Sequence, residues 1–184
     1  MTVEELLVRS AMAYGDAESY ADRGVITIIQ PSRRNEYGFT TMWVRDGDFS
    51  YMVQGPAGSQ FAQFEIHKAG VRFETIRGGS YGQAPTLEAA IGPFQNIMTV
   101  FTTNVPRLLA GDNWGPTNDY ENARIVGVTS MNGQPTIMIE LDLIEQGEAS
   151  VWLDQATLMI RRLAHQSPKN EAFVTVTFNQ LEAR

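Results

Sequence analysis

The sequence predicts a mainly β (α+β) protein built on one large antiparallel sheet, and three observations support this fold class. Between Ala123 and Gln180, apolar residues alternate with polar ones along four successive runs, the pattern of strands with one buried face. Asn132-Gly133 separates two of these runs and supplies the positive φ angles that a tight hairpin turn requires. Helical periodicity is confined to the first residues and to the middle of the chain.

Length, composition and charge limit the possible domain organisation, chemistry and partners of the protein. The 184 residues suffice for one substantial core, and no linker-like stretch divides them, so a single domain spanning 1–184 is expected. The absence of cysteine excludes disulfides and thiol chemistry. A net charge of -7 without a long basic cluster argues against a nucleic-acid partner. No run of about 18 apolar residues occurs, so no transmembrane segment is expected.

The first element is predicted to be a helix from Thr2 to about Tyr14. Thr2 and Glu5 have the spacing of a capping box, in which each side chain accepts from the other residue's backbone N–H. The apolar residues that share one face of this helix are Val3, Leu6, Leu7, Ala11 and Tyr14.

Strands are predicted to fill the next sixty residues. Asp46-Gly47 and Ala69-Gly70 are expected at hairpin turns, and the Gly-rich segment Gly78–Gly82 is interpreted as a flexible turn. The expected strand segments are Asp22–Gln30, the hairpin Glu36–Val53, and the pair Gln60–Lys68 and Val71–Arg77.

The middle of the chain predicts short helices followed by a loop. Helical spacing is present at Thr86–Ile91 and more strongly from Pro93 to Leu109. Pro106 has no backbone N–H to donate, so a kink or break is expected near Asn104. Gly111–Asn122 is polar and is interpreted as a loop.

A sheet of roughly ten strands will curl, and the helical segments are expected to cover its concave face. An apolar groove would remain wherever this cover is incomplete. Its candidate ligand-binding residues are Trp43, Phe49, Tyr51, Phe64, Phe94, Met98 and Phe101. The alternative is that these aromatic and methionine side chains are ordinary core.

No catalytic residue, metal site or cofactor is predicted. His67 and His165 lie on predicted strands, and either would need a converging carboxylate or second ligand to serve as a base or bind a metal. Glu140 and Asp142 alternate with apolar residues and are expected on a solvated face. A solvated loop is preferred over a calcium site for the oxygen-bearing residues Asp112, Asn113, Asp119, Glu121 and Asn122.

The order of these elements resembles the periplasmic lipoprotein-carrier (LolA-like) superfamily, including its uncharacterised predicted periplasmic members. The segments that carry the resemblance are Thr41–Arg45, Ala123–Gly127, Val151–Asp154 and Ile160–Leu163. It implies a half-open β-barrel whose cavity takes acyl chains, helices that act as a lid, and no catalytic residue. Such carriers follow the aromatic strand with a basic residue and proline, whereas Asp46-Gly47 follows Arg45 here, so no gating role is transferred to Arg45.

The resemblance also implies a periplasmic location. The chain starts Met1-Thr2-Val3-Glu4, which has no basic region or apolar stretch of an export signal, and a trimmed signal peptide is the alternative.

Three functional classes follow. The first is non-catalytic binding or carriage of a lipid, an acyl chain or another hydrophobic ligand, with a hydrophobic small molecule or a lipidated protein as partner and transient contact with the membrane or envelope proteins. The second is an envelope protein-interaction or structural module with a packed core. The third is a small-molecule enzyme on the same scaffold. We adopt the first class, non-catalytic binding or carriage of a hydrophobic ligand, as our hypothesis.

Overall fold

The computed structural model describes residues 1–184 except 56–62, 78, 92–102, 112–119, 146 and 169–170, and except the side chains of residues 63 and 64.

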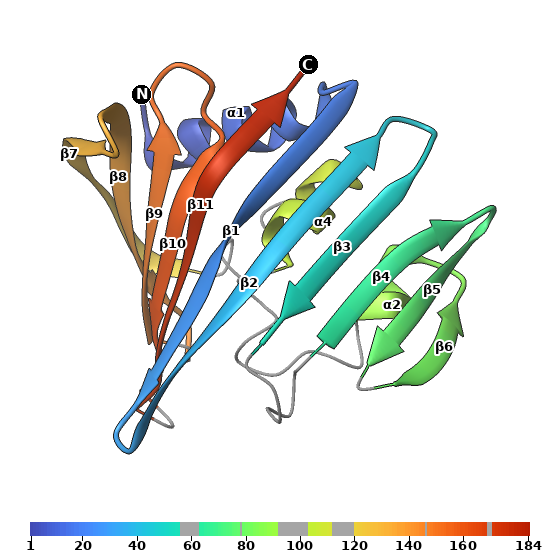
Figure 1. The fold of residues 1–184 in the computed structure, drawn as a ribbon. Helices are drawn as coiled ribbons and strands as arrows, with labels where there is room; N and C mark the ends of the chain where they lie inside the picture. The colour runs from blue at the N-terminus through green and yellow to red at the C-terminus, as the bar shows by residue number, and fades with distance from the viewer. Residues whose placement is uncertain (56–62, 78, 92–102, 112–119, 146, 169–170) are drawn as a thin grey trace.

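Eleven strands in the described part of the chain form one antiparallel sheet (Figure 1). They are β1 (Ser19–Gln30), β2 (Arg33–Val44), β3 (Phe49–Gln54), β4 (Gln63–Ala69), β5 (Arg72–Arg77), β6 (Ser80–Ala84), β7 (Tyr120–Met131), β8 (Gln134–Leu143), β9 (Gly147–Asp154), β10 (Ile160–Gln166) and β11 (Phe173–Ala183). Their order is β6-β5-β4-β3-β2-β1-β11-β10-β9-β8-β7, so the first and last strands of the chain pair in the middle. β6 and β7 are the two edges, and the sheet does not close.

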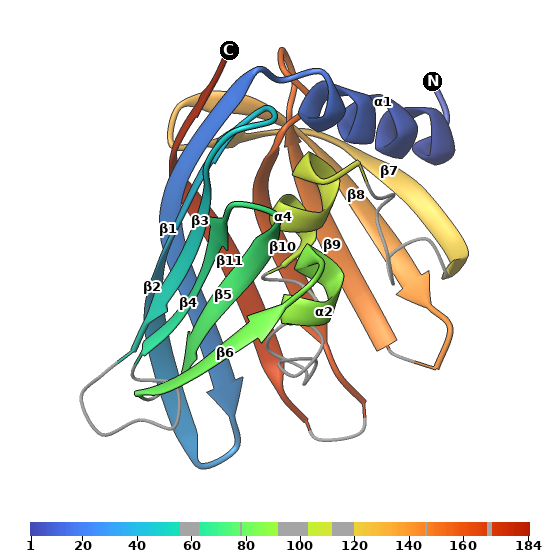
Figure 2. The same ribbon diagram turned by 90° about the vertical axis from the view of Figure 1, so that its right-hand side faces the viewer.

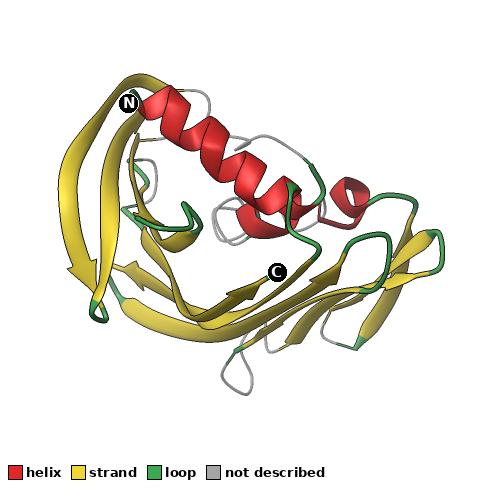
Figure 3. Ribbon diagram, turned by 90° about the horizontal axis from the view of Figure 1, so that it is seen from above, coloured by secondary structure: helices red, strands yellow, loops and turns green. Residues whose placement is uncertain are grey.

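The sheet curls around three described helices, α1 (Val3–Gly15), α2 (Leu87–Ile91) and α4 (Asn104–Leu109). All three lie on its concave side, and α1 crosses the opening at one end (Figures 2 and 3). The buried side chains of alternate strand positions face these helices and form one continuous core. The predicted large curled sheet with helices on its concave face is therefore confirmed.

Helix α1 begins where the sequence predicts. The Thr2 side chain accepts from the Glu5 backbone N–H at 3.1 Å, and the Glu5 carboxylate accepts from the Thr2 backbone N–H at 2.7 Å. Leu6, Leu7 and Tyr14 are buried against the sheet, which fixes the side of the helix that faces inward.

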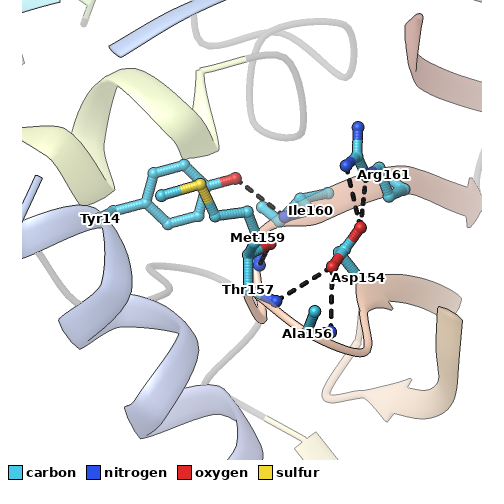
Figure 4. A network of polar contacts seen from close by, with 7 residues as sticks. All are labelled: Tyr14, Asp154, Ala156, Thr157, Met159, Ile160 and Arg161. Carbon is cyan, nitrogen blue, oxygen red and sulfur yellow. Dashed lines mark hydrogen bonds and ion pairs between the residues drawn. The ribbon is translucent and has the colours of Figure 1, made fainter. Parts of the chain in front are cut away.

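A tight turn between β9 and β10 prepares the docking site of α1 (Figure 4). Asp154 Oδ1 accepts from the backbone N–H groups of Ala156 and Thr157, both at 3.0 Å. Its Oδ2 accepts from Arg161 Nε at 3.1 Å and Nη2 at 2.9 Å. Burial alone would raise the pKa of Asp154, but these donors outweigh it and hold the pKa below its usual value.

The turn leaves the Ile160 backbone N–H facing the helix. It donates to the Tyr14 hydroxyl at 2.9 Å, across 146 positions of the sequence (Figure 4). Tyr14 is completely buried, and its ring packs against Tyr20 of β1 with centroids 5.5 Å apart. Because an unsatisfied N–H in the core is costly, this bond fixes where the end of α1 lies.

The predicted turns are confirmed by backbone geometry. Asp46 between β2 and β3, Gly70 between β4 and β5, and both Asn132 and Gly133 between β7 and β8 have positive φ angles, between 51° and 79°.

Four boundaries differ from expectation. β1 starts at Ser19 rather than Asp22, and β2 starts at Arg33 rather than Glu36. Ser80–Ala84 is a strand, β6, rather than part of a flexible turn, and Tyr120–Asn122 belong to β7 rather than to a loop. In each case the neighbouring strand supplies a ladder of backbone partners, which does not require strong local β propensity. Helix α4 begins at Asn104, near the expected kink or break, while residues 93–102 of the predicted helical segment fall outside the described residues.

Candidate ligand-binding site

A pocket of about 340 Å³ opens at the rim of the concave face. It lies where the β2–β3 turn and the β4–β5 hairpin approach the ends of α1 and α4 and the start of α2. We call it the rim pocket. Its large apolar lining residues are Trp43, Phe49, Phe73, Leu87, Pro106 and Leu109. The volume falls in the range of about 300–1,000 Å³ typical of small-molecule sites.

Strand alternation directs the aromatic wall into this pocket. Trp43 shares the concave face of β2 with Phe39 and pairs directly with Phe49 across the hairpin. The rings of Phe49 and Phe73 meet edge to face, with centroids 6.0 Å apart and planes at 73°. Phe49 is buried whereas Trp43 is only partly buried, so the wall is anchored in the core and ends at the surface.

Arg45 closes one side of the rim pocket. Its Nη2 donates to the backbone carbonyls of Gly15 at 2.5 Å and Ala17 at 2.8 Å, at the C-terminal end of α1, and its Nε lies 3.1 Å from a Glu18 carboxylate oxygen. The guanidinium carbon also lies 5.8 Å from the centre of the Trp43 ring. Arg45 therefore joins the β2–β3 turn to the helix end, where a cation is favoured by the helix dipole.

The structure brings only part of the predicted site together. Trp43 and Phe49 line the rim pocket, whereas Tyr51 is 1% exposed and belongs to the core. The Phe64 side chain lies outside the described atoms, as do the residues Phe94, Met98 and Phe101.

Sequence reasoning missed most of the lining, including Lys68, Phe73, Leu87 and Leu109. Period-two alternation through Ile66 would have placed Lys68 on the apolar face of its strand, and a lysine there is a signal of an incomplete core. The sequence does not predict that α2 and α4 lie beside the β4–β5 hairpin, because this arrangement depends on how the sheet curls.

A buried acid lies on the same concave face, away from the rim pocket. Asp22 of β1 is 6% exposed and accepts from the Tyr20 hydroxyl at 2.6 Å. Burial raises its pKa to about 6, although hydrogen bonds from Tyr20 and Thr41 oppose the rise. Burial also raises the pKa of Tyr20 well above its usual value. A carboxyl with a raised pKa is common in active sites, but this one is too enclosed for a substrate to reach it.

The two histidines occupy opposite faces of the sheet. His67 Nε2 lies 2.7 Å from a Glu65 carboxylate oxygen on the convex face, and His165 is 6% exposed on the concave face opposite Val174. Within the residues described, no group of three or more His, Asp or Glu side chains could hold a metal ion. Of the oxygen-bearing loop residues, Glu121 and Asn122 lie on β7, and Asp112, Asn113 and Asp119 lie outside the description.

Three larger hollows lack a wall of several aromatic rings. The first, of about 520 Å³, lies over β7, β8 and β9, where charged residues such as Glu140 and Asp142 occupy the solvated face as predicted and Glu140 pairs with Arg124. The second, of about 400 Å³, lies between the β7–β8 turn and β11. The third, of about 780 Å³, lies between the end of α1 and the end of β11, with Asp16, Arg161 and Arg184 among its lining. The rim pocket is the hollow with the aromatic wall.

Solved structures resemble this chain over almost its whole length. MucB of Pseudomonas aeruginosa, solved in complex with MucA, matches with a TM-score of 0.55 and 16% identity, over 97% of this chain and 56% of that one. LprF from Mycobacterium bovis matches with a TM-score of 0.55 and 13% identity, over 97% and 91%. The Mycobacterium tuberculosis lipoprotein LppX matches with a TM-score of 0.50 and 11% identity, over 98% and 96%.

The chain shares the fold of MucB, LprF and LppX. The resemblance stated from the sequence is thus confirmed at the level of the fold. The chain spans about half the length of the MucB chains that it matches. No protein-family model and no curated protein sequence matches it. No helix in the described segments is long and apolar enough to cross a membrane.

Proposed function

We propose that this protein binds a hydrophobic molecule non-catalytically in the rim pocket, as a carrier or sensor in the periplasm. The observation that carries the proposal is the aromatic wall of Trp43, Phe49 and Phe73, which faces Leu87 and Leu109 across an open hollow. A ligand that covers these side chains would gain about 25 cal/mol for each Å² of apolar surface removed from water.

The arrangement of the pocket supports an exchangeable ligand. Its walls come from the sheet on one side and from the ends of three helices on the other. Small shifts of the short helices α2 and α4 against the sheet would therefore widen the pocket without breaking any strand ladder.

The first experiment is native mass spectrometry with lipid extraction on the purified protein, followed by titration with a fluorescent fatty-acid probe. We expect Trp43→Ala to weaken probe binding by at least about tenfold, or 1.4 kcal/mol. Trp152→Ala is the matched control, because Trp152 is also half-buried and also stacks on an arginine, Arg162, but on the convex face. A clean apo mass and no probe binding by the wild type would overturn the proposal.

A second candidate function is the binding of a partner protein along β7. This edge strand exposes Ile125, Val126 and Val128, and an edge strand with apolar side chains is a template for an added strand. The complex of MucB with MucA supports this candidate for the fold. Under this reading, Val126→Lys would abolish partner capture from envelope extracts and leave probe binding intact.

A further inference from the structure

Lys68 is the unusual member of the rim pocket. It follows Ile66, which is fully buried, by two positions on β4 and pairs with Phe73 on β5, so its side chain lies on the concave face beside the aromatic wall. Strand lysines normally point to water, and this one is only half-exposed.

Among the residues that the structure describes, Lys68 forms no ion pair and no hydrogen bond through its ammonium group. The other cation of the pocket is fully engaged, since Arg45 binds two carbonyls of the α1 end and faces Glu18. The acidic residue in the lining, Asp46, lies on the exposed β2–β3 turn and is not within ion-pair distance of Lys68. The pocket therefore presents one unneutralised positive charge beside an apolar wall.

We propose that the rim pocket takes a long-chain carboxylate, with the ammonium of Lys68 binding the carboxylate and the aromatic wall holding the hydrocarbon chain. This rests on the proposed function and specifies its ligand class. One available cation matches one negative charge, whereas a phosphate dianion would need further donors that Arg45 cannot supply while it binds α1. The hydrocarbon chain of the ligand would partly exclude water from the ion pair between Lys68 and the carboxylate. This ion pair would therefore be stronger than one on an open surface.

The test compares three probes of equal chain length by calorimetry: dodecanoate, dodecanol and dodecyltrimethylammonium. Wild-type protein should bind dodecanoate about 10- to 100-fold more tightly than dodecanol, the range for a charge-assisted hydrogen bond. Lys68→Met, which keeps the length and apolar stem, should reduce dodecanoate affinity by that factor and leave dodecanol affinity unchanged. Lys68→Arg should retain most of the preference.

Arg72→Met is the matched control, because Arg72 carries the same charge near the same turn but is exposed and does not line the pocket. Equal binding of dodecanoate and dodecanol, or tight binding of the trimethylammonium probe, would overturn the carboxylate proposal while hydrophobic binding stands. Failure of every probe to bind would overturn both. The thermal midpoint of each variant separates loss of binding from loss of folding.

Discussion

Gly24 shows how one residue without a side chain lets two aromatic rings meet. A Cβ atom at this position would lie 2.0 Å from the Thr177 carbonyl oxygen and 2.6 Å from the Phe39 ring. Phe39 and Phe178, the partners of Gly24 on either side, pack edge to face over it with centroids 5.2 Å apart. The β-bulge beside it, between Arg23 and Gly24, adjusts the register to allow this approach.

Gly24→Ala should therefore lower the free energy of unfolding by about 1–3 kcal/mol, the usual cost of overpacking a core. Gly38→Ala is the matched control, since Gly38 lies on the adjacent strand and a Cβ there meets nothing within 4 Å. Urea unfolding of both variants provides the measurement. Equal effects of the two substitutions would show that the close approach at Gly24 is not what matters.

Asp22 gives the protein a specific dependence on pH. Its pKa of about 6 in the folded state exceeds the value of 3.8 expected when unfolded, so the folded protein holds this proton more tightly. The resulting contribution to stability is complete below pH 3.8 and is lost as the pH rises through 6. A shift of roughly two pKa units corresponds to about 3 kcal/mol.

We expect Asp22→Asn to gain stability relative to the wild type by about this amount as the pH rises from 3.8 to above 6. The comparison between variant and wild type at each pH removes the contributions of the other titrating groups. A difference between Asp22→Asn and the wild type that stays constant over this pH range would contradict the assignment.

At the scale of elements, Arg45 connects the β2–β3 turn to the last turn of α1. Loss of its two hydrogen bonds in Arg45→Met should cost about 1–3 kcal/mol and should increase hydrogen exchange in the last turn of the helix. Arg34→Met removes an exposed ion pair with Glu36 and should change stability by less than about 1 kcal/mol. Unchanged exchange at the end of α1 in Arg45→Met would show that the sheet alone positions the helix.

Local chemistry made some elements predictable and others not. The capping box at Thr2 and the Asn132-Gly133 turn act over a few residues, so the sequence identifies them directly. β6 has no apolar alternation of its own and exists because β5 offers it a ladder. The site follows the same division: strand alternation predicts the inward orientation of Trp43 and Phe49, whereas the free charge of Lys68 depends on which side chains the curled sheet brings near it.

For the whole molecule, the pairing of β1 with β11 decides how the chain behaves as a unit. Strands β6 to β1 form one half of the sheet and β11 to β7 form the other. In the strand order, the backbone ladder between β1 and β11 joins the two halves. The buried core nevertheless draws on both halves, with Tyr51 from one and Val151 from the other in the same cluster. No local sequence pattern specifies this pairing, because the partners lie about 150 positions apart.

If the two halves share one cooperative core, they should unfold together, as the prediction of a single domain over 1–184 requires. Two variants test this: Trp114→Phe with Trp152→Phe leaves Trp43 to report on β2, and Trp114→Phe with Trp43→Phe leaves Trp152 to report on β9. In each variant, tryptophan fluorescence and circular dichroism should give the same urea midpoint.

A substitution at Val176, which is 1% exposed and lies opposite Ile26 in the β1–β11 ladder, tests the same point by perturbing the shared core. Val176→Ala should lower both midpoints equally, because its cavity lies in a core common to both halves. Separate midpoints, or a shift of only one, would mean that the ladder joins two independently stable units, and the rim pocket, built on the β6–β1 half with the helices, could then open without unfolding the rest.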